Sequence, residues 1–571
     1  MRIKIIRVII ILGLLCLAAG LVYTQGIRGI FYYHQSVNNR IRVIPVEGIR
    51  GRILDRNGVV LAENRLSFNV TMIPQDIKEN DQVFHYLSQV LNVKKSKLAQ
   101  QYSQKKHAPF APVVVAEDVD KKVAMIVEEN KFRFPGLYVQ EHYRRHYPMG
   151  SVGAHLLGQV GKINRTQMEK LKDYGYTPLS IVGYSGIEEY YDRYLKGKEG
   201  GMQIEVNSRG QQVRLLSIRE AENGEDVHLT IDARIQQIAQ EALGPRKGAI
   251  VVMDFDSGEI LGMVSFPTYD PNIFVDHRLR GQISSAYSNP EAPLLNRAIQ
   301  GQYPPGSVFK IVVSIAALAN KKISKHTTFH CPGYYTLGKR QFRCAHVHNN
   351  QNLIEGIAHS CNVYFFNTGL LIGPDQLYKY ARLLGLGDVT HVDLPAEEKG
   401  FIPSRRFRRI KNPTGWYKGD TLNYSIGQGE VLVTPLQIAR LNTTVGRGGK
   451  EVQPFLIKRI GEQDIVQFST VRLVNLDPEI FKIIQEGVLG AVKDPYGTAR
   501  ILDMPGFKIS GKTGTAQSVP GKDEHAWFAG YSLEGKRRVS FCVFLEYGGS
   551  SYNAVVLTRE LFQRLRAEDI L

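Results

Sequence analysis

The stretch from Tyr303 to Lys310 constrains the fold of this chain more than any other part of its sequence. Two prolines and a glycine end the preceding segment, and the apolar, alanine-rich run Val308–Asn320 that follows is typical of a buried helix. We therefore expect Ser307 at the N-terminus of that helix, where free backbone N–H groups and the helix dipole favour an oxyanion. Lys310, three residues later, would lie on the same helix face.

A lysine buried beside a serine has a chemical use. Loss of solvation favours the neutral amine, and a neutral Lys310 can take the proton of Ser307 and make it a nucleophile. The alternative is a serine N-cap followed by a lysine that extends to solvent, and an S-x-x-K pattern alone does not separate the two.

Two later motifs favour the nucleophile. Ser360-Cys361-Asn362 lies 53 residues after Ser307, and Lys512-Thr513-Gly514-Thr515 lies 150 residues after Asn362. S-x-x-K, S-x-N and K-T-G in this order are the motifs of serine β-lactamases and penicillin-binding proteins, and the chain resembles that superfamily. On its own, the triplet at 360–362 would be interpreted as a loop or a helix cap.

The resemblance implies a role for each residue of the first two motifs. Ser307 would attack an acyl carbonyl, and Lys310 would take its proton. Ser360 would pass a proton between Lys310 and the leaving amine, and Asn362 would hold Lys310 and a substrate amide. The family acylates its serine on D-alanyl-D-alanine ends of wall stem peptides, releases D-alanine and passes the acyl group to a neighbouring amine. β-Lactams mimic that end and trap the serine.

The third motif lies in an alternating strand pattern, Lys508–Ala516, and is expected to bind the substrate. Lys512 would supply positive charge for the substrate's terminal carboxylate and lower the pKa of Lys310. The hydroxyl groups of Thr513 and Thr515 would bind the same carboxylate.

Gly514 is expected to let a peptide backbone approach closely and pair as an added strand. In the family the oxyanion hole uses two backbone N–H groups, which correspond here to Ser307 and Thr515. This chemistry is expected to need no cofactor.

Several stretches narrow the resemblance to the elongation-type branch of class B penicillin-binding proteins, penicillin-binding protein 2. They are Arg297–Ser307, Ser425–Gly429 and Tyr269–Asn272. Two further stretches, Arg50–Gly58 and Gly183–Glu188, resemble the non-catalytic part of class B penicillin-binding proteins in general. β-Lactamases lack a segment like Arg50–Gly58. Members of this branch work beside a rod-shape-type membrane glycosyltransferase and a wall-elongation scaffold protein that contacts the pedestal, so the resemblance implies both partners.

The run Ile5–Tyr23 is apolar or small except for Arg7. Its 19 residues would span about 28 Å as a helix, close to the thickness of a bilayer core. Basic residues at Arg2 and Lys4 favour a cytoplasmic N-terminus, and we interpret the run as an uncleaved single-pass anchor in the inner membrane. A removed signal peptide is the alternative.

In either case the remaining chain, with its catalytic domain, is expected in the periplasm. The net charge of +18 would otherwise suggest a nucleic-acid partner. In that compartment the charge instead suits anionic lipid head groups or a pyrophosphate-linked substrate, and no nucleic acid is expected.

The order of patterns predicts three parts: a cytoplasmic tail and anchor at 1–25, a non-catalytic α+β pedestal at 26–224 and a transpeptidase domain at 225–571. In the last part, strands precede and follow a long helical middle, which predicts an α/β (α+β) fold with helices on both faces of one antiparallel sheet. The expected strands are Gly248–Asp254, Glu259–Phe266, Ile509–Ala516, Ala526–Ser532 and Arg538–Tyr547.

In the pedestal, the patterns at Asp76–Gln104 and Asp118–Glu129 predict helices, and Pro135–Tyr147 predicts a strand. That strand is strongly basic. Its Arg144 and Arg145 are interpreted most simply as a solvated face, with a partner site as the alternative.

Four residues between the first two motifs have the spacing of a Cys₃His zinc site: Cys331, Cys344, His348 and Cys361. Some elongation-type relatives resemble this, with carboxylate, histidine and cysteine ligands at matching positions. Such a metal would hold the loop that carries the second motif. A disulfide among the cysteines, free thiols, and His346 or His330 in place of His348 remain alternatives.

Two other functional classes are compatible with the motifs. One is a hydrolase, either a β-lactamase or a D,D-carboxypeptidase, and the long pedestal and anchor argue against a secreted lactamase. The other is a non-enzymatic β-lactam sensor or polymerase activator. A sensor should carry a cytoplasmic effector or several spans, and only a few residues precede this anchor.

Overall fold

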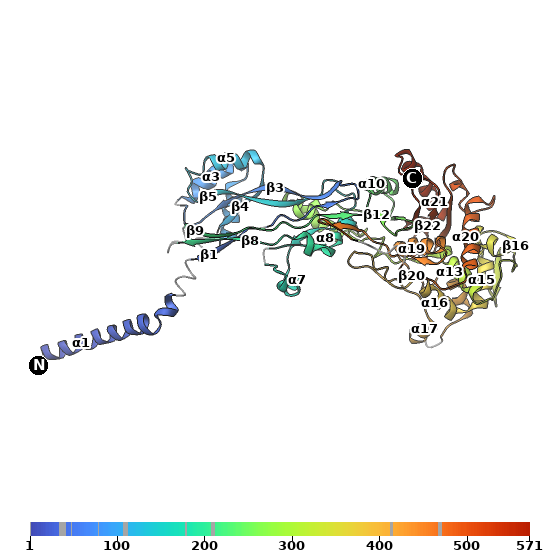
Figure 1. Cartoon of the computed structure of the whole chain (residues 1–571), viewed down its shortest axis with the longest axis horizontal. Helices are drawn as coiled ribbons and strands as arrows, with labels where there is room; N and C mark the ends of the chain where they lie inside the picture. Colours follow the sequence, from blue (N-terminus) through green and yellow to red (C-terminus); the bar gives the residue numbers. More distant parts are fainter. Residues whose placement is uncertain are drawn as a thin grey trace.

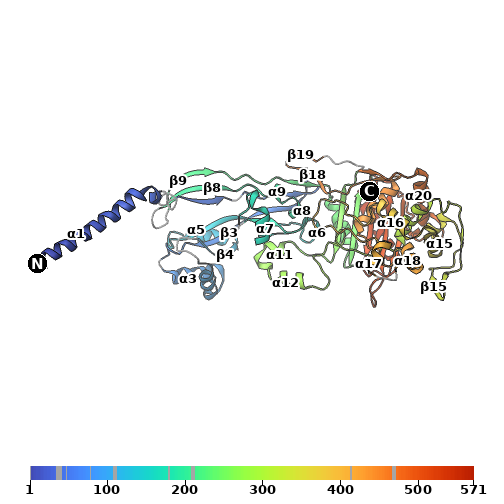
Figure 2. The same ribbon diagram turned by 90° about the horizontal axis from the view of Figure 1, so that it is seen from below.

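The computed structural model describes residues 2–33, 41–46, 48–77, 79–106, 112–177, 180–206, 212–411, 415–465 and 471–571. The molecule is elongated, with three parts in a row along its longest axis (Figure 1). A helix projects at the N-terminal end, a pedestal of long strands follows, and a lobe rich in helices contains the C-terminus. A view turned by 90° shows the same order (Figure 2).

The N-terminal helix α1 (Arg2–Leu21) continues into a π-helical stretch, η1 (Val22–Ile27). The segment Ile3–Ile27 has 25 residues; its most apolar stretch of 18 residues has a mean hydropathy of 2.8, and none of that stretch is buried in the protein. A helix of this length spans about 37 Å, which is enough to cross a bilayer core. The predicted apolar helix is thus confirmed, and it extends four residues beyond Tyr23.

The pedestal is built on a seven-stranded sheet around the long strand β3 (Val60–Met72). Its order is β19 (Gln463–Asp464), β18 (Ile457–Ile460), β10 (Val227–Leu229), β2 (Ile53–Leu54), β3 and β4 (Val113–Val119), with β5 (Leu137–His146) also paired to β3. Strands β2 and β3 pair antiparallel. Strands from both sides of residue 225 therefore share one sheet.

A helical head packs on one end of this sheet. Its helices are α3 (Asn80–Leu91), α4 (Lys95–Lys105) and α5 (Lys121–Glu129). They confirm the predicted helical patterns, although the first pattern forms two helices and α4 ends one residue later than predicted. Apolar side chains of α3 and α4 form one core with those of β3 and β4. On the side towards α1 lies a second sheet of β1 (Ile41–Val46), β8 (Gly200–Val206) and β9 (Gln212–Arg219).

The remaining elements of this half are short. They are α6 (Ala154–Leu157), β6 (Val160–Lys162), α7 (Arg165–Leu171), η2 (Lys172–Tyr174), β7 (Ile181–Gly183), α8 (Gly186–Tyr190) and α9 (Asp192–Leu195).

The interpretation of Arg144 and Arg145 as a solvated face is wrong. Arg145 is 4% exposed, and it donates hydrogen bonds to Glu188 Oε1 at 2.6 Å and to the carbonyl oxygen of Gly51 at 2.7 Å. Arg144 donates to Asp118 Oδ2 at 2.8 Å. Because Glu188 and Gly51 are distant in sequence, the pattern around Arg145 could not reveal that a carboxylate would bury it.

The lobe contains a five-stranded antiparallel sheet. Its order is β12 (Ile260–Phe266), β11 (Gly248–Asp254), β23 (Val539–Leu545), β22 (His525–Ser532) and β21 (Ile509–Ala516). All five predicted strands are present, and strands from the two ends of the lobe sequence pair directly. Within the described residues β21 has only β22 as a strand partner, so it forms an edge of the sheet.

Helices cover both faces of this sheet, as predicted. Helices α10 (Ala233–Leu243) and α21 (Ser551–Ala567) share a core with Ile250 and Val252 of β11. On the other face, α13 (Lys310–Ala319), α19 (Pro435–Gly446) and α20 (Pro478–Lys493) share a core with Val251. The alternation of β11 side chains between two apolar cores explains why its residues from Ala249 to Met253 are all hydrophobic.

The other elements of the lobe are α11 (Asn272–Val275), η3 (His277–Leu279), α12 (Gly281–Ser288), η4 (Gly306–Phe309), β13 (Phe329–Cys331), β14 (Tyr334–Leu337), β15 (Arg340–Arg343), β16 (Asn349–Gln351), α14 (Leu353–Ala358), α15 (Asn362–Ile372), α16 (Pro374–Leu383), α17 (Arg405–Lys411), α18 (Lys418–Ser425), β17 (Lys450–Glu451), β20 (Arg472–Leu473) and η5 (Arg500–Leu502).

Candidate active site

Ser307 lies in the 3₁₀ turn η4, directly before α13 begins at Lys310. A 3₁₀ helix has three residues per turn, so Ser307 and Lys310 lie on the same side of the backbone. The N-cap alternative for Ser307 is wrong, because its side chain makes no capping hydrogen bond and the N-cap of α13 is Phe309. Ser307 is half-buried, so part of its surface is open to solvent at the start of the helix.

The side chain of Lys310 joins the first two motifs. It is fully buried, and its Nζ donates to Ser360 O at 2.7 Å, Ser360 Oγ at 3.1 Å and Asn362 Oδ1 at 2.7 Å. Burial lowers the pKa of Lys310 to about 8. About one lysine in ten is then neutral at pH 7, compared with fewer than one in a thousand for an exposed lysine.

The second motif is both a helix cap and part of the site. Cys361 is the N-cap of α15, and its Sγ accepts a hydrogen bond from Tyr364 N. Ser360 has a φ of +56°, a left-handed conformation that is uncommon for serine. Its carbonyl and hydroxyl oxygens both accept hydrogen bonds from Lys310, so this strained position serves the lysine.

The third motif forms the middle of β21. Lys512 is fully buried, and its Nζ donates to Thr513 O at 3.3 Å and Thr513 Oγ1 at 3.4 Å. Burial, and next the positive charge of Lys310, lower the pKa of Lys512 well below its usual value.

The charge of Lys310 contributes to lowering the pKa of Lys512. Repulsion between two neighbouring amines acts on both of them, and the prediction that Lys512 lowers the pKa of Lys310 stays a prediction.

Gly514 is needed for a contact within the protein itself. A Cβ at this position would lie 2.7 Å from the carbonyl oxygen of Pro305 and 3.0 Å from Val308 Cγ2. On the opposite side of the same contact, a Cβ on Gly306 would lie 2.5 Å from Thr515 O. The turn that carries the nucleophile therefore packs directly on the third motif.

Thr515 is held from two sides. Its Oγ1 accepts a hydrogen bond from Ser551 N at 3.2 Å, and its carbonyl oxygen accepts one from Gln428 Nε2 at 3.4 Å. Gln428 lies in the stretch Ser425–Gly429 that carries the family resemblance, but the sequence did not identify it as a contact of the third motif.

Thr498 is a second residue that the sequence did not identify. Thr513 Oγ1 donates a hydrogen bond to Thr498 Oγ1 at 3.0 Å. Thr498 lies in the loop between α20 and η5, and a single threonine in such a loop carries no pattern from which its place beside the third motif could be found.

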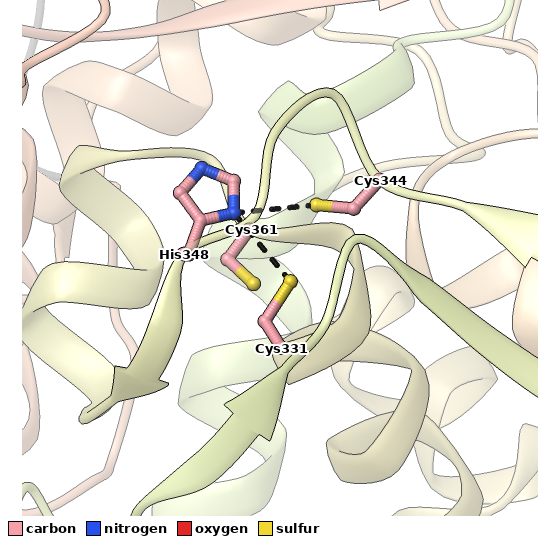
Figure 3. A group of neighbouring side chains, drawn as sticks. All are labelled: Cys331, Cys344, His348 and Cys361. Carbon is pink, nitrogen blue, oxygen red and sulfur yellow. Dashed lines mark hydrogen bonds between the residues drawn. The ribbon is translucent and has the colours of Figure 1, made fainter.

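The four residues with zinc-site spacing lie together (Figure 3). Sulfur and nitrogen atoms of Cys331, Cys344, His348 and Cys361 all lie within 4.8 Å of one another. His348 Nδ1 is 3.4 Å from Cys344 Sγ and 3.6 Å from Cys331 Sγ. No disulfide joins these cysteines, and the group does not include His330 or His346.

The chemistry of this cluster fits a metal. Hydrogen bonding with Cys361 lowers the pKa of Cys344, which favours a thiolate there. Three sulfur atoms and one imidazole nitrogen are a common ligand set of structural zinc. Asn362 N donates to Cys344 Sγ at 3.2 Å, so the cluster is in direct contact with the second motif.

Comparison with known proteins agrees with this geometry. Residues 248–565 match the family described as "Penicillin binding protein transpeptidase domain", and residues 45–229 match the "Penicillin-binding Protein dimerisation domain". The chain belongs to the penicillin-binding protein transpeptidase family. The predicted branch, penicillin-binding protein 2, is confirmed by the relatives.

Relatives of this penicillin-binding protein cover nearly its whole length. The Escherichia coli (strain K12) protein "Peptidoglycan D,D-transpeptidase MrdA" is 30% identical over 581 residues, which cover 97% of this chain and 92% of that protein. A solved complex of PBP2 and MreC from Helicobacter pylori matches with a TM-score of 0.80 and 28% identity, over 93% of this chain and 99% of that one. A chain of a solved peptidoglycan synthase complex matches with a TM-score of 0.74 and 31% identity, over 98% and 97%.

Proposed function

We propose that this protein is a peptidoglycan D,D-transpeptidase of cell-wall elongation that works through a serine acyl-enzyme and is inhibited by β-lactams. The proposal depends mainly on Lys310, which is buried and lies one helical turn after Ser307. The amine of Lys310 contacts both Ser360 and Asn362. These contacts bring the first two motifs to one point, and the packing of η4 on β21 adds the third.

Acylation begins when neutral Lys310 takes the proton of Ser307, which attacks the carbonyl of the penultimate D-alanine. Ser360 Oγ, in contact with the Lys310 amine, passes that proton to the departing D-alanine. Backbone N–H groups of Ser307 and Thr515 stabilise the oxyanion, and each such donor is worth about 100- to 1,000-fold in rate. An amine of a second stem peptide then attacks the ester and gives up a proton to neutral Lys310; the ester bond to Ser307 breaks, and that proton returns to the Ser307 oxygen as the cross-link forms.

The edge strand β21 supports binding of the donor peptide as an added strand. Lys512, Thr513 and Thr515 would bind its terminal carboxylate. The carboxylate's negative charge would raise the pKa of the buried Lys512 back towards its usual value and so favour the charged amine only when substrate is present.

Zinc is proposed for the group of Cys331, Cys344, His348 and Cys361 in a structural role. When bound, it would link β13, the turn after β15 and the start of α15 to one another, and it would take no part in the reaction. These residues would hold Ser360 and Asn362 against Lys310, because Asn362 N already contacts Cys344 Sγ.

We further propose a single-pass protein of the inner membrane, with α1 as the anchor and the pedestal and lobe in the periplasm. The apolar helix supports the anchor. Domain limits at 1–25, 26–224 and 225–571 are part of the proposal. The solved relatives with MreC and in a peptidoglycan synthase complex support a scaffold partner and a rod-shape-type glycosyltransferase partner.

Fluorescent penicillin labelling tests the nucleophile. The wild type should be labelled covalently, and Ser307→Ala should not be labelled although its melting temperature is unchanged. Covalent labelling of the alanine variant at the wild-type level would show that another residue is acylated. Wall cross-link analysis after depletion of the protein then separates transfer to an amine from hydrolysis.

A further inference from the structure

The hydroxyl of Thr513 is part of a chain of hydrogen bonds in which each group donates to the next one. Lys512 Nζ donates to Thr513 Oγ1 at 3.4 Å, and Thr513 Oγ1 donates to Thr498 Oγ1 at 3.0 Å. Thr498 Oγ1 in turn donates to the carbonyl oxygen of Ala358, at a long distance of 3.4 Å. A hydroxyl group has one proton, so Thr513 has no proton left for a ligand in this arrangement.

A substrate carboxylate can only accept hydrogen bonds, so Thr513 must turn its proton away from Thr498 to bind it. Thr498 can then rotate as well, leave its weak bond to Ala358 O and donate to Thr513 instead. Both hydroxyl groups rotate about their C–O bonds, and no proton is transferred from one oxygen to the other. The charge-assisted bond to the carboxylate is stronger than the neutral bond it replaces, which drives the reversal.

The loop that carries Thr498 is held firmly enough for such a role. At its start, Asp494 Oδ1 accepts a hydrogen bond from Tyr496 N at 2.7 Å and lies 3.1 Å from His359 Nε2. The other ring nitrogen of His359 lies 2.7 Å from Gln351 Oε1, and its ring is parallel to that of His348 with centroids 6.2 Å apart.

The end of the loop is attached to the same region. Thr498 N donates to Ala358 O at 3.3 Å, so its backbone and its hydroxyl share one acceptor at the last residue of α14. Asp494 and Thr498 are thus fastened to His359 and Ala358, which are neighbours in sequence. The Thr498 hydroxyl therefore stays at one place beside β21 while its proton is free to turn.

We propose that Thr498 is a positioning residue for the terminal carboxylate of the substrate, acting through the Thr513 hydroxyl. It accepts the Thr513 proton in the empty site and donates its own proton to Thr513 when the carboxylate is bound. The inference rests on the proposed acyl-enzyme function of the same site. Its ligand class is a peptide or β-lactam with a free carboxylate next to the scissile amide.

Two substitutions separate this role from simple packing. Thr498→Val keeps the shape and removes the hydroxyl, whereas Thr498→Ser keeps the hydroxyl. Thr268→Val is the matched control, because Thr268 is also half-buried and also donates to a backbone carbonyl, that of Ser151, outside the site. Acylation rate constants are measured by mass spectrometry with benzylpenicillin and with its methyl ester, which lacks the charged carboxylate.

Thr498→Val should slow acylation by benzylpenicillin about five- to tenfold, as expected for one weakened hydrogen bond, and should leave acylation by the ester within twofold. Thr498→Ser should restore the rate with benzylpenicillin to within twofold, and Thr268→Val should change neither rate. If the valine variant does not fold, as judged by its melting temperature, Thr498→Ala takes its place.

Equal losses with the acid and the ester would overturn the inference, because they would indicate general damage to the site. An unchanged rate with benzylpenicillin would overturn it as well. A wild-type protein that neither penicillin acylates would instead refute the proposed function, so the two failures are distinguishable.

Discussion

Replacement of Gly514 with alanine tests whether the contact between β21 and the turn of Ser307 is required for acylation. The added Cβ would lie 2.7 Å from the carbonyl oxygen of Pro305, 3.0 Å from Val308 Cγ2 and 3.2 Å from Trp527 Cβ. Ordinary contacts of this kind begin at 3.4 Å, and the shortest distance here is 2.7 Å. The strand and the turn must therefore separate by the difference, about 0.7 Å.

A rotamer change cannot relieve this clash. The nearest atom belongs to the backbone, and Trp527 closes the other side, where its Nε1 donates to Pro304 O at 3.0 Å. Displacement of a reacting group by about 1 Å costs about 100-fold in rate, and overpacking costs about 1–3 kcal/mol of stability. We therefore expect Gly514→Ala to fold with a lowered melting temperature and to be acylated about 100-fold more slowly.

The assay is the second-order rate constant for labelling by fluorescent penicillin, with the melting temperature measured on the same samples. Gly281→Ala is the control, because a Cβ at Gly281 in α12 has no atom within 4 Å. It should match the wild type in both measurements. A Gly514→Ala protein labelled within threefold of the wild-type rate would refute the argument that this contact sets the nucleophile's position.

Arg145→Ala should lower the free energy of unfolding by about 3 kcal/mol in denaturant titrations, because it removes a partner of the buried Glu188 carboxylate. The control is Arg165→Ala, whose side chain is 95% exposed; it should change the free energy of unfolding by less than about 0.5 kcal/mol. Equal effects of the two would contradict burial of the pair. The acylation rate should rise about tenfold per pH unit below pH 8 and become constant above it. Lys310 acts as a base only after it loses its proton, and burial lowers its pKa to about 8. A rate that does not change between pH 6 and pH 8 would exclude that role. Metal analysis should find one zinc per chain and clearly less in Cys344→Ser, and no zinc in the wild type would remove the metal proposal.

The sequence predicted those parts of the fold that depend on local patterns. The five strands of the lobe sheet and the apolar N-terminal helix have periodicities that are visible in short windows. The meeting of Lys310 with Ser360 and Asn362 could also be predicted, but only because three ordered motifs resemble a family whose arrangement is known.

Contacts between residues without a motif could not be predicted. Arg145 looks like a surface residue until the fold brings Glu188 to it from 43 positions away. Thr498 reaches the third motif through a loop whose course depends on α20 and on Ala358. The glycine at 514 was recognised, but whether it makes room for a ligand or for Pro305 depends on tertiary packing.

The pedestal sheet has a consequence for the order in which this protein can be completed during synthesis. Strand β10 lies between β2, which is made early, and β18 at Ile457–Ile460, which is made some 230 residues after β10, by difference of the residue numbers. Until that late strand leaves the ribosome, the edge of β10 lacks its partner and can pair with another chain. A polypeptide that stops before residue 457 would keep this edge open permanently, so the pedestal sheet is completed only after most of the lobe has been synthesised.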